Sequence, residues 1–287
     1  MEPLQYTYVI VLLLLAAATP VVPDMVRLRP GTYLAGSPPE EARAAGHPPE
    51  LAAHEQPVRR VRIRRAFAIM RTEVTRDAFS LFVEASGWRP DGACSHLVDG
   101  SANRWSTDPQ RSWRNPGFEQ SGRHPVVCVN LADARAYARW LSAQTGRRFR
   151  LPTGDEWEHA ARAGTAGPRW WRPDSVACRF ANLSDQRRAD AHNGGVSDPA
   201  KFFACDDGHL FTAPVASYRP NGWGLFDMLG NVWEWTTDCV VAGCQSVFDR
   251  GGSWTNSPRY VRSASKHPEK AEARTTVLGF RLVEDLR

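Results

Sequence analysis

Oxygen-bearing side chains are concentrated in the segment 221–235, NGWGLFDMLGNVWEW. Asp227, Asn231 and Glu234 bring two carboxylates and an amide into one short loop, and three glycines there permit tight turns. Calcium takes about six to eight oxygen ligands, backbone carbonyls included, and loops of this kind supply them. The segment is therefore either a calcium site or a set of turns capped by polar side chains.

A second group of oxygen ligands lies upstream. Asn182 and the neighbouring carboxylates Asp206 and Asp207 offer a second cluster of oxygen ligands. Their residue types suit the same hard cation. The two interpretations given for the first segment stay open here too.

Thiol chemistry is the other possibility. The chain has six cysteines, an even number with no C-x-x-C pair that would indicate zinc: Cys94, Cys128, Cys178, Cys205, Cys239 and Cys244. Six cysteines can pair in 15 ways, and the sequence leaves the pairing open, although Cys239 and Cys244 are close enough to bridge a short loop. Three disulfides would require an oxidising compartment, whereas six buried thiols would suit a cytosolic protein.

The N-terminus favours the oxidising compartment. Residues 8–19 form an unbroken apolar run that is shorter than the roughly 20 residues a membrane span needs. Its length suits a secretory signal, with cleavage after the alanines 16–18. We therefore expect a signal peptide over 1–18 and a periplasmic or secreted protein. Glu2 is atypical of a signal, so an uncleaved anchor or a start at Met25 are the alternatives.

The remaining composition is that of an ordinary globular protein. Apolar residues make up 42% and charged residues 23% of 287, which excludes a disordered chain or a coiled coil. No other long apolar stretch occurs, so no membrane association is expected once the signal is cleaved. The net charge of +5 includes a basic run at 58–67 that alternates with apolar residues. A half-buried strand explains that alternation, and no nucleic-acid partner is expected.

Helix caps indicate the elements that hold these residues. Three helices are predicted, from Thr75 to Gly87, from Asn130 to Gly146 and from Thr153 to Gly164. Residues 35–57, rich in proline, alanine and charge, are predicted to be a loop. With short strands and turns after residue 164, the pattern predicts one α+β domain with much irregular structure.

The order of several blocks gives a resemblance. The chain resembles the formylglycine-generating-enzyme-like (sulfatase-modifying factor) family at 25–37 (MVRLRPGTYLAGS), 72–74, 124–140, 150–164 (RLPTGDEWEHAARAG), 212–215, 221–235, 250–254 (RGGSW) and 279–282 (GFRL). The resemblance implies a single domain related to C-type lectins over 25–287. It also implies two structural calcium sites, one from Asn182, Leu183, Asp207 and His209, the other from Asp227, Gly230, Val232 and Glu234.

The same resemblance argues against the family's best-known reaction. Formylglycine-generating members hold copper(I) between two thiolates just after RGGS, and here Asn256 and Val261 occupy those positions. Formylglycine generation is therefore not expected. Ser253, Asn256 and Trp233 are the candidate catalytic residues that remain.

The surface around these residues would form the substrate groove. Trp254, Arg259 and Arg262 are expected to line it; the alternative is a packed turn with solvated arginines. No redox metal is identified, and His209 and His267 are candidate bases by residue type alone.

The closer resemblance is to an exported subset that lacks the thiolate pair, similar to the pyoverdine-maturation type, and it includes the six cysteines and the NSPR segment 256–259. It suggests oxidative maturation of a peptide or peptide-derived substrate. The alternative is a non-catalytic binding or accessory module for an exported partner protein. A sulfatase activator with rearranged chemistry is a weaker third hypothesis.

Overall fold

The computed structural model describes residues 22–98, 104–193 and 201–286. The predicted signal peptide 1–18 lies outside them, so it stays a prediction. Within the described residues no helix is long and apolar enough to span a bilayer.

Local capping explains the three helices predicted from the sequence: α3 Arg76–Ser86, α4 Leu131–Thr145 and α5 Gly154–Arg162. The Thr75 side chain accepts a hydrogen bond at the start of α3, and complete capping boxes begin α4 and α5. Gly87 and Gly146 end α3 and α4 in the left-handed conformation. These predictions are confirmed: Ala163 is the left-handed C-cap of α5, and Gly164 lies beyond its end.

The prediction of a loop over 35–57 is wrong. The segment contains α1 Pro39–Ala44, α2 Pro49–Ala52 and the 3₁₀ turn η1 Ala53–Glu55. Each helix begins with a proline, which suits the first helical position, and carries acidic residues in its first turn. We call residues 36–55 the N-terminal arm.

One antiparallel sheet joins the two ends of the described chain in the order β1-β4-β12-β7: β1 Met25–Leu28, β4 Phe67–Met70, β12 Val283–Asp285 and β7 Phe149–Arg150. A separate ribbon pairs β2 Gly31–Ala35 with β3 Arg59–Ile63. The predicted strand 58–67 is thus divided between β3 and the start of β4. In β3 the alternation holds, because Val61 and Ile63 are buried while Arg60 and Arg62 are exposed.

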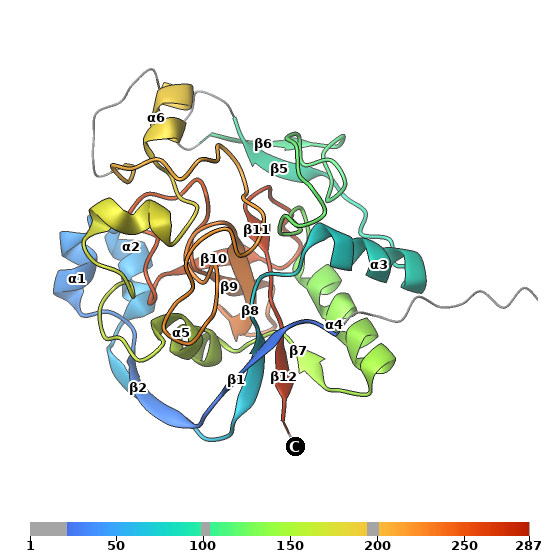
Figure 1. Cartoon of the computed structure of the whole chain (residues 1–287), viewed down its shortest axis with the longest axis horizontal. Helices are drawn as coiled ribbons and strands as arrows, with labels where there is room; N and C mark the ends of the chain where they lie inside the picture. Colours follow the sequence, from blue (N-terminus) through green and yellow to red (C-terminus); the bar gives the residue numbers. More distant parts are fainter. Residues whose placement is uncertain (1–21, 99–103, 194–200, 287) are drawn as a thin grey trace, which may run out of the picture.

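The second sheet positions the candidate site. Its order is β10-β9-β8-β11: β10 Lys266–Lys270, β9 Ser246–Arg250, β8 Trp233–Cys239 and β11 Leu278–Gly279. It occupies the middle of the molecule, with α1 and α2 on one side and α3 and α4 on the other (Figure 1). A ribbon of β5 Cys94–Leu97 and β6 Trp105–Asp108, the turn η2 Asp174–Arg179 and α6 Gln186–Asn193 complete the described elements. The single α+β domain with much irregular structure is confirmed.

Three disulfides join the loops: Cys94–Cys128, Cys178–Cys205 and Cys239–Cys244. The first ties β5 to the segment before α4, and the last closes the short loop after β8, as its spacing indicated. All six cysteines are therefore paired, which leaves none as a free thiolate.

Candidate functional site

The register of two strands places three potential ligands on one face of the second sheet. β9 and β10 are antiparallel, with Asp249 directly opposite His267. Glu269 follows two residues later on β10, and residues two apart in a strand share a face. One ligand atom from each residue lies within 4.8 Å of the others. The strand pairing thus forms a compact acid–imidazole–acid cluster.

This cluster opens into a hollow of about 660 Å³. We call it the β8–β10 groove. Arg188, Lys201 and residues of the β5–β6 ribbon contribute to its lining, together with Trp233, Asp249, His267, Glu269, Asn256 and Arg259. Pockets of roughly 300–1,000 Å³ are typical of small-molecule and cofactor sites. The groove therefore has the size for a small or peptide-derived ligand.

The charges of the groove are mixed. Burial raises the pKa of Asp249, which is only 2% exposed. Burial by itself lowers the pKa of His267, but the negative charge of Asp249, whose Oδ1 lies 3.5 Å from His267 Nδ1, raises it to about 8. Burial and Asp249 also raise the pKa of Glu269. Acidic and basic groups thus face the same space, as proton transfer requires.

Three of the residues predicted from the sequence line the groove: Trp233, Asn256 and Arg259. Asn256 Oδ1 accepts hydrogen bonds from the backbone N–H of Ser253 at 2.9 Å and from its hydroxyl at 2.7 Å. These bonds fix the turn after β9 and the position of Asn256. The Arg259 guanidinium lies over the Tyr260 ring and donates to Ser257 Oγ at 3.2 Å.

The other predicted residues lie beneath this surface. Ser253 and Val261 are completely buried. Trp254 is buried with its ring against Phe118 and Phe211, and the Arg188 guanidinium lies over it. These residues support the floor of the groove but do not line it.

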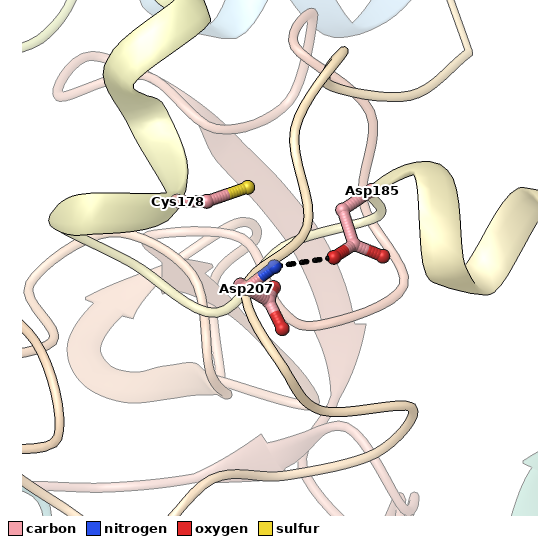
Figure 2. Close-up of side chains that lie close together, drawn as sticks. All are labelled: Cys178, Asp185 and Asp207. Atoms are coloured by element: carbon pink, nitrogen blue, oxygen red, sulfur yellow. Dashed lines mark hydrogen bonds between the residues drawn. The ribbon is translucent and has the colours of Figure 1, made fainter.

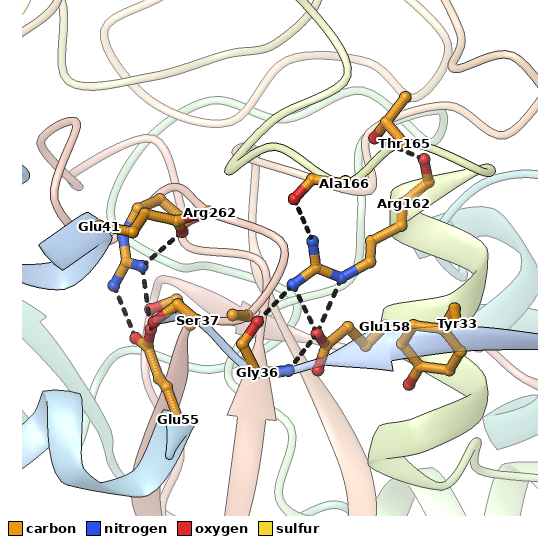
Figure 3. A network of polar contacts seen from close by, with 12 residues as sticks. Tyr33, Gly36, Ser37, Glu41, Glu55, Glu158, Arg162, Thr165, Ala166 and Arg262 are labelled. Atoms are coloured by element: carbon orange, nitrogen blue, oxygen red, sulfur yellow. Dashed lines mark hydrogen bonds and ion pairs between the residues drawn. The ribbon is translucent and has the colours of Figure 1, made fainter. Parts of the chain in front are cut away.

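Arg262 belongs to a buried ion-pair network rather than to the groove. Its guanidinium bonds both oxygens of Glu55, at 2.6 and 2.9 Å, and it also pairs with Glu41 (Figure 3). Ser37 donates to the same Glu55 carboxylate. The arrangement connects the N-terminal arm to the segment that follows β9. Arg262 therefore fixes the position of that segment and contacts no groove space.

A second network lies beside it in Figure 3. Glu158 on α5 pairs with Arg162 on one side and with Arg250 on the other, all three nearly inaccessible to solvent. The backbone N–H of Gly36 donates to Glu158, and Arg162 donates to the Gly36 carbonyl. This network connects the N-terminal arm to α5 and to the end of β9.

The first calcium set partly fits a cation. Asn182 Oδ1 is buried without a hydrogen-bond partner. The Asp207 carboxylate accepts the backbone N–H groups of Leu183 and His209, at 2.7 and 2.9 Å. Burial and the charge of Asp185 raise the pKa of Asp207 to about 7. These oxygens suit a hard cation, which would balance the two adjacent carboxylates.

Figure 2 shows the surroundings of Asp207. The backbone N–H of Asp207 donates to Asp185, and the sulfur of Cys178 lies nearby. Because that sulfur is bonded to Cys205, it is not a thiolate and cannot serve as a strong metal ligand. The cluster therefore offers oxygen ligands only.

The second calcium set fits less well. Asp227 Oδ1 lacks a hydrogen-bond partner, as a ligand oxygen would. Glu234, however, is engaged at both oxygens by Arg281 at 2.7–2.9 Å and receives a bond from Trp157 Nε1 at 2.8 Å. In this arrangement a guanidinium already neutralises Glu234, and Gly230 and Val232 could contribute only carbonyl groups.

Sequence reasoning missed Asp249 and Glu269 and named His267 only by residue type. Their joint position depends on the β9–β10 register, which no local pattern reveals. His209 lies elsewhere, beside Tyr218 and in a shallow hollow that also contains His124. The structure thus separates the two candidate bases and brings only His267 into the groove.

Fold and groove together define a disulfide-bonded α+β domain with a ligand-sized, mixed-charge hollow on its central sheet. The sulfatase-modifying factor enzyme 1-like domain matches residues 14–286, and the chain belongs to that family.

Among its relatives, the formylglycine-generating enzyme of Streptomyces coelicolor is 33% identical over 312 aligned positions, covering 91% of this chain and 88% of that protein. The mouse protein named inactive C-alpha-formylglycine-generating enzyme 2 is 30% identical, covering 90% of this chain and 85% of the relative. The solved structure of PvdO from Pseudomonas aeruginosa aligns with a TM-score of 0.73 at 30% identity, over 92% of this chain and 95% of PvdO.

Proposed function

We propose that the chain is an exported member of this family that oxidatively matures a peptide or peptide-derived substrate in the β8–β10 groove, without a copper(I)-dithiolate site. The observation that carries the proposal is the convergence of His267, Asp249 and Glu269 with Arg259 in one groove. Titratable groups gathered in a cleft are the usual mark of a reactive site. The similarity to PvdO is consistent with this assignment.

The argument against copper(I) chemistry rests on the pairing of the cysteines. Copper(I) selects soft thiolate ligands, and all six sulfurs of this chain are in disulfides. Asn256, at one of the positions where the resemblance expects a cysteine, faces the groove, and Val261, at the other, is buried. Neither side chain is a ligand for copper(I).

Each groove residue then has a definite part. Arg259 pairs with a carboxylate of the substrate, and Trp233 forms an apolar wall against which its carbon skeleton packs. The oxidation removes two electrons and two protons from the substrate and passes them to dioxygen, which is reduced to hydrogen peroxide, and the cluster of Asp249, His267 and Glu269 relays the protons. Asn256, its carbonyl fixed by Ser253, orients its amide toward the bound molecule.

Export and calcium binding are part of the same proposal. The apolar run 8–19 and three disulfides support a periplasmic or secreted protein. Asn182, Asp207 and the carbonyls of Leu183 and His209 would hold a structural calcium ion that stabilises the loops near η2. The Asp227–Glu234 set is the weaker of the two candidates.

A second function uses the same groove without chemistry. A non-catalytic module would bind a peptide-derived ligand or an exported partner protein through the same mixed charges. The similarity to a mouse relative whose name calls it inactive favours this alternative.

An experiment in living cells distinguishes the two functions. The gene is deleted in the source organism, and exported peptide-derived metabolites are compared by mass spectrometry. The proposal predicts that a precursor two hydrogens heavier than the normal product accumulates. Wild type and the exposed control Arg62→Gln restore the product, whereas His267→Ala and Arg259→Ala do not. Full restoration by His267→Ala would contradict a catalytic groove.

A further inference from the structure

We propose that Asp249, His267 and Glu269 form a binding site for one divalent first-row transition metal on the floor of the β8–β10 groove. The proposal rests on the proposed function only for the location of the substrate. The metal site itself stands on the geometry of the two strands and is tested without any substrate.

The strand pairing presets the ligand arrangement. Asp249 and His267 are cross-strand partners, and Glu269 is on the same face of β10. Metal–ligand distances of about 2.0–2.2 Å place ligand atoms on either side of an ion about 4 Å apart. The three ligand atoms already lie within 4.8 Å of one another. Small side-chain rotations are therefore enough to enclose an ion.

A buried oxygen points to the missing ligand. The side chain of Asp249 is 3% exposed, and its Oδ1 has no hydrogen-bond partner. Leaving a buried carboxylate oxygen unsatisfied is costly, which requires an explanation. His267 Nδ1 is 3.5 Å away, too far for a good hydrogen bond. An ion between the two atoms would satisfy both.

The donor set indicates the class of metal. One imidazole nitrogen with two carboxylates suits iron(II), manganese(II) or zinc(II), whereas copper(I) prefers thiolates. The side chain of His267 is 40% exposed toward the groove, so the ion would keep open positions. Three protein ligands with an open position are typical of catalytic rather than structural sites.

Neighbouring charges shape what binds beside the ion. Arg259, Arg188 and Lys201 line the same groove and oppose a free cation. Lys266 is directed away from the cluster, over the Phe248 ring on the other face of β10. The arginine-rich side favours an anionic substrate group, which would bridge the metal and Arg259.

Zinc binding tests the site directly. The full-length mature protein is stripped with EDTA, dialysed, supplied with excess calcium to saturate oxygen-only sites, and titrated calorimetrically with zinc chloride. We expect one zinc ion per chain. Because outer-shell groups alone contribute about 10- to 100-fold to affinity, Asp249→Asn and Glu269→Gln should each weaken binding more than about tenfold. The matched control Glu272→Gln, an exposed acid on the turn after β10, leaves affinity unchanged.

A second probe and a fold check complete the test. Cobalt(II) gives a visible spectrum that reports its ligands, and His267→Ala should change it. Circular dichroism identifies any variant that fails to fold. If Asp249→Asn fails to fold because the side chain is buried, the zinc affinity of Glu269→Gln, at a partly exposed residue, tests the site alone. No zinc binding by wild type, or equal affinity in wild type and Glu269→Gln, overturns the proposal. If the wild-type protein binds zinc but the deletion strain matures its exported metabolites normally, the proposed function is overturned and the metal site is not.

Discussion

Glu55→Gln removes the negative charge at the centre of the network that anchors the N-terminal arm to the segment bordering the groove (Figure 3). The Glu55 carboxylate accepts a hydrogen bond from Ser37 and two from Arg262, and His47 lies 3.1 Å away. Both ion-pair partners are almost completely buried. Glutamine would leave the guanidinium charge of Arg262 only partly compensated, by Glu41.

The pKa gives the size of the effect. Burial opposes ionisation of Glu55, but the close contact with His47 and the charge of Arg262 lower its pKa from 4.5 to about 2. At about 1.4 kcal/mol per pH unit, this lowering is worth about 3 kcal/mol of stability. Removing one partner of a buried pair typically costs about 3–5 kcal/mol. We expect Glu55→Gln to lower the free energy of unfolding by about 3–5 kcal/mol at pH 7.

The pH dependence has a definite sign. Because the folded-state pKa is lower than the unfolded one, the contribution is complete above about pH 4.5 and is lost as the pH falls toward 2. Guanidinium chloride denaturation with the disulfides intact, followed by tryptophan fluorescence, measures it between pH 7 and pH 3. The stability difference should narrow below pH 4.5. Glu40→Gln, an exposed acid of α1, is the control. A loss below about 1 kcal/mol at pH 7, or no narrowing, would refute the reasoning.

The remaining predictions concern loops, ions and the groove. Replacing the Cys94–Cys128 pair by serines should lower the free energy of unfolding by about 4 kcal/mol, and replacing the Cys239–Cys244 pair by about 2 kcal/mol. The difference arises because the closed loops span 34 and 5 residues, and a longer loop loses more chain entropy when it is closed. Chemical denaturation of the two variants measures both losses. Asp207→Asn with Asn182→Ala should lower the melting temperature and abolish its response to EDTA, and an unchanged response excludes calcium at this site. Asp227→Ala with Glu234→Ala should lower the melting temperature whether or not calcium binds, since it leaves Arg281 buried and unpaired, so only the EDTA response tests calcium there. Asn256→Ala should impair maturation in cells and also lower the melting temperature, because it removes the acceptor of the buried Ser253 N–H and hydroxyl; normal maturation would remove Asn256 from the site.

The helices of this fold could be predicted because their signals are local. The caps at Thr75, Asn130 and Thr153 each contact residues within one turn, so the sequence contains the whole interaction. The arm helices have comparable local signals, a proline followed by acidic residues, but the abundance of proline and alanine in this segment favours a loop. The helix α1 and the turn η1 are also stabilised by ion pairs of Glu41 and Glu55 with the distant Arg262, which no local pattern contains.

The site was only partly predictable for the same reason. Asn256, Arg259 and Trp233 were found through a family resemblance, which preserves the groove position. Asp249 and Glu269 were not, because each is an ordinary strand residue until antiparallel pairing brings it to His267. Arg262 has a surface-like residue type, and only the tertiary contact with Glu55 explains its burial.

Reconstitution outside the cell tests the central claim most directly. Extract from the deletion strain, enriched in the precursor, is incubated in air with purified mature protein and analysed by mass spectrometry. The account predicts that the precursor is converted into a product lighter by two hydrogens by wild type and by Arg62→Gln, but not by His267→Ala. A precursor that binds the wild-type protein yet remains unchanged would contradict catalysis and identify the groove as a binding site.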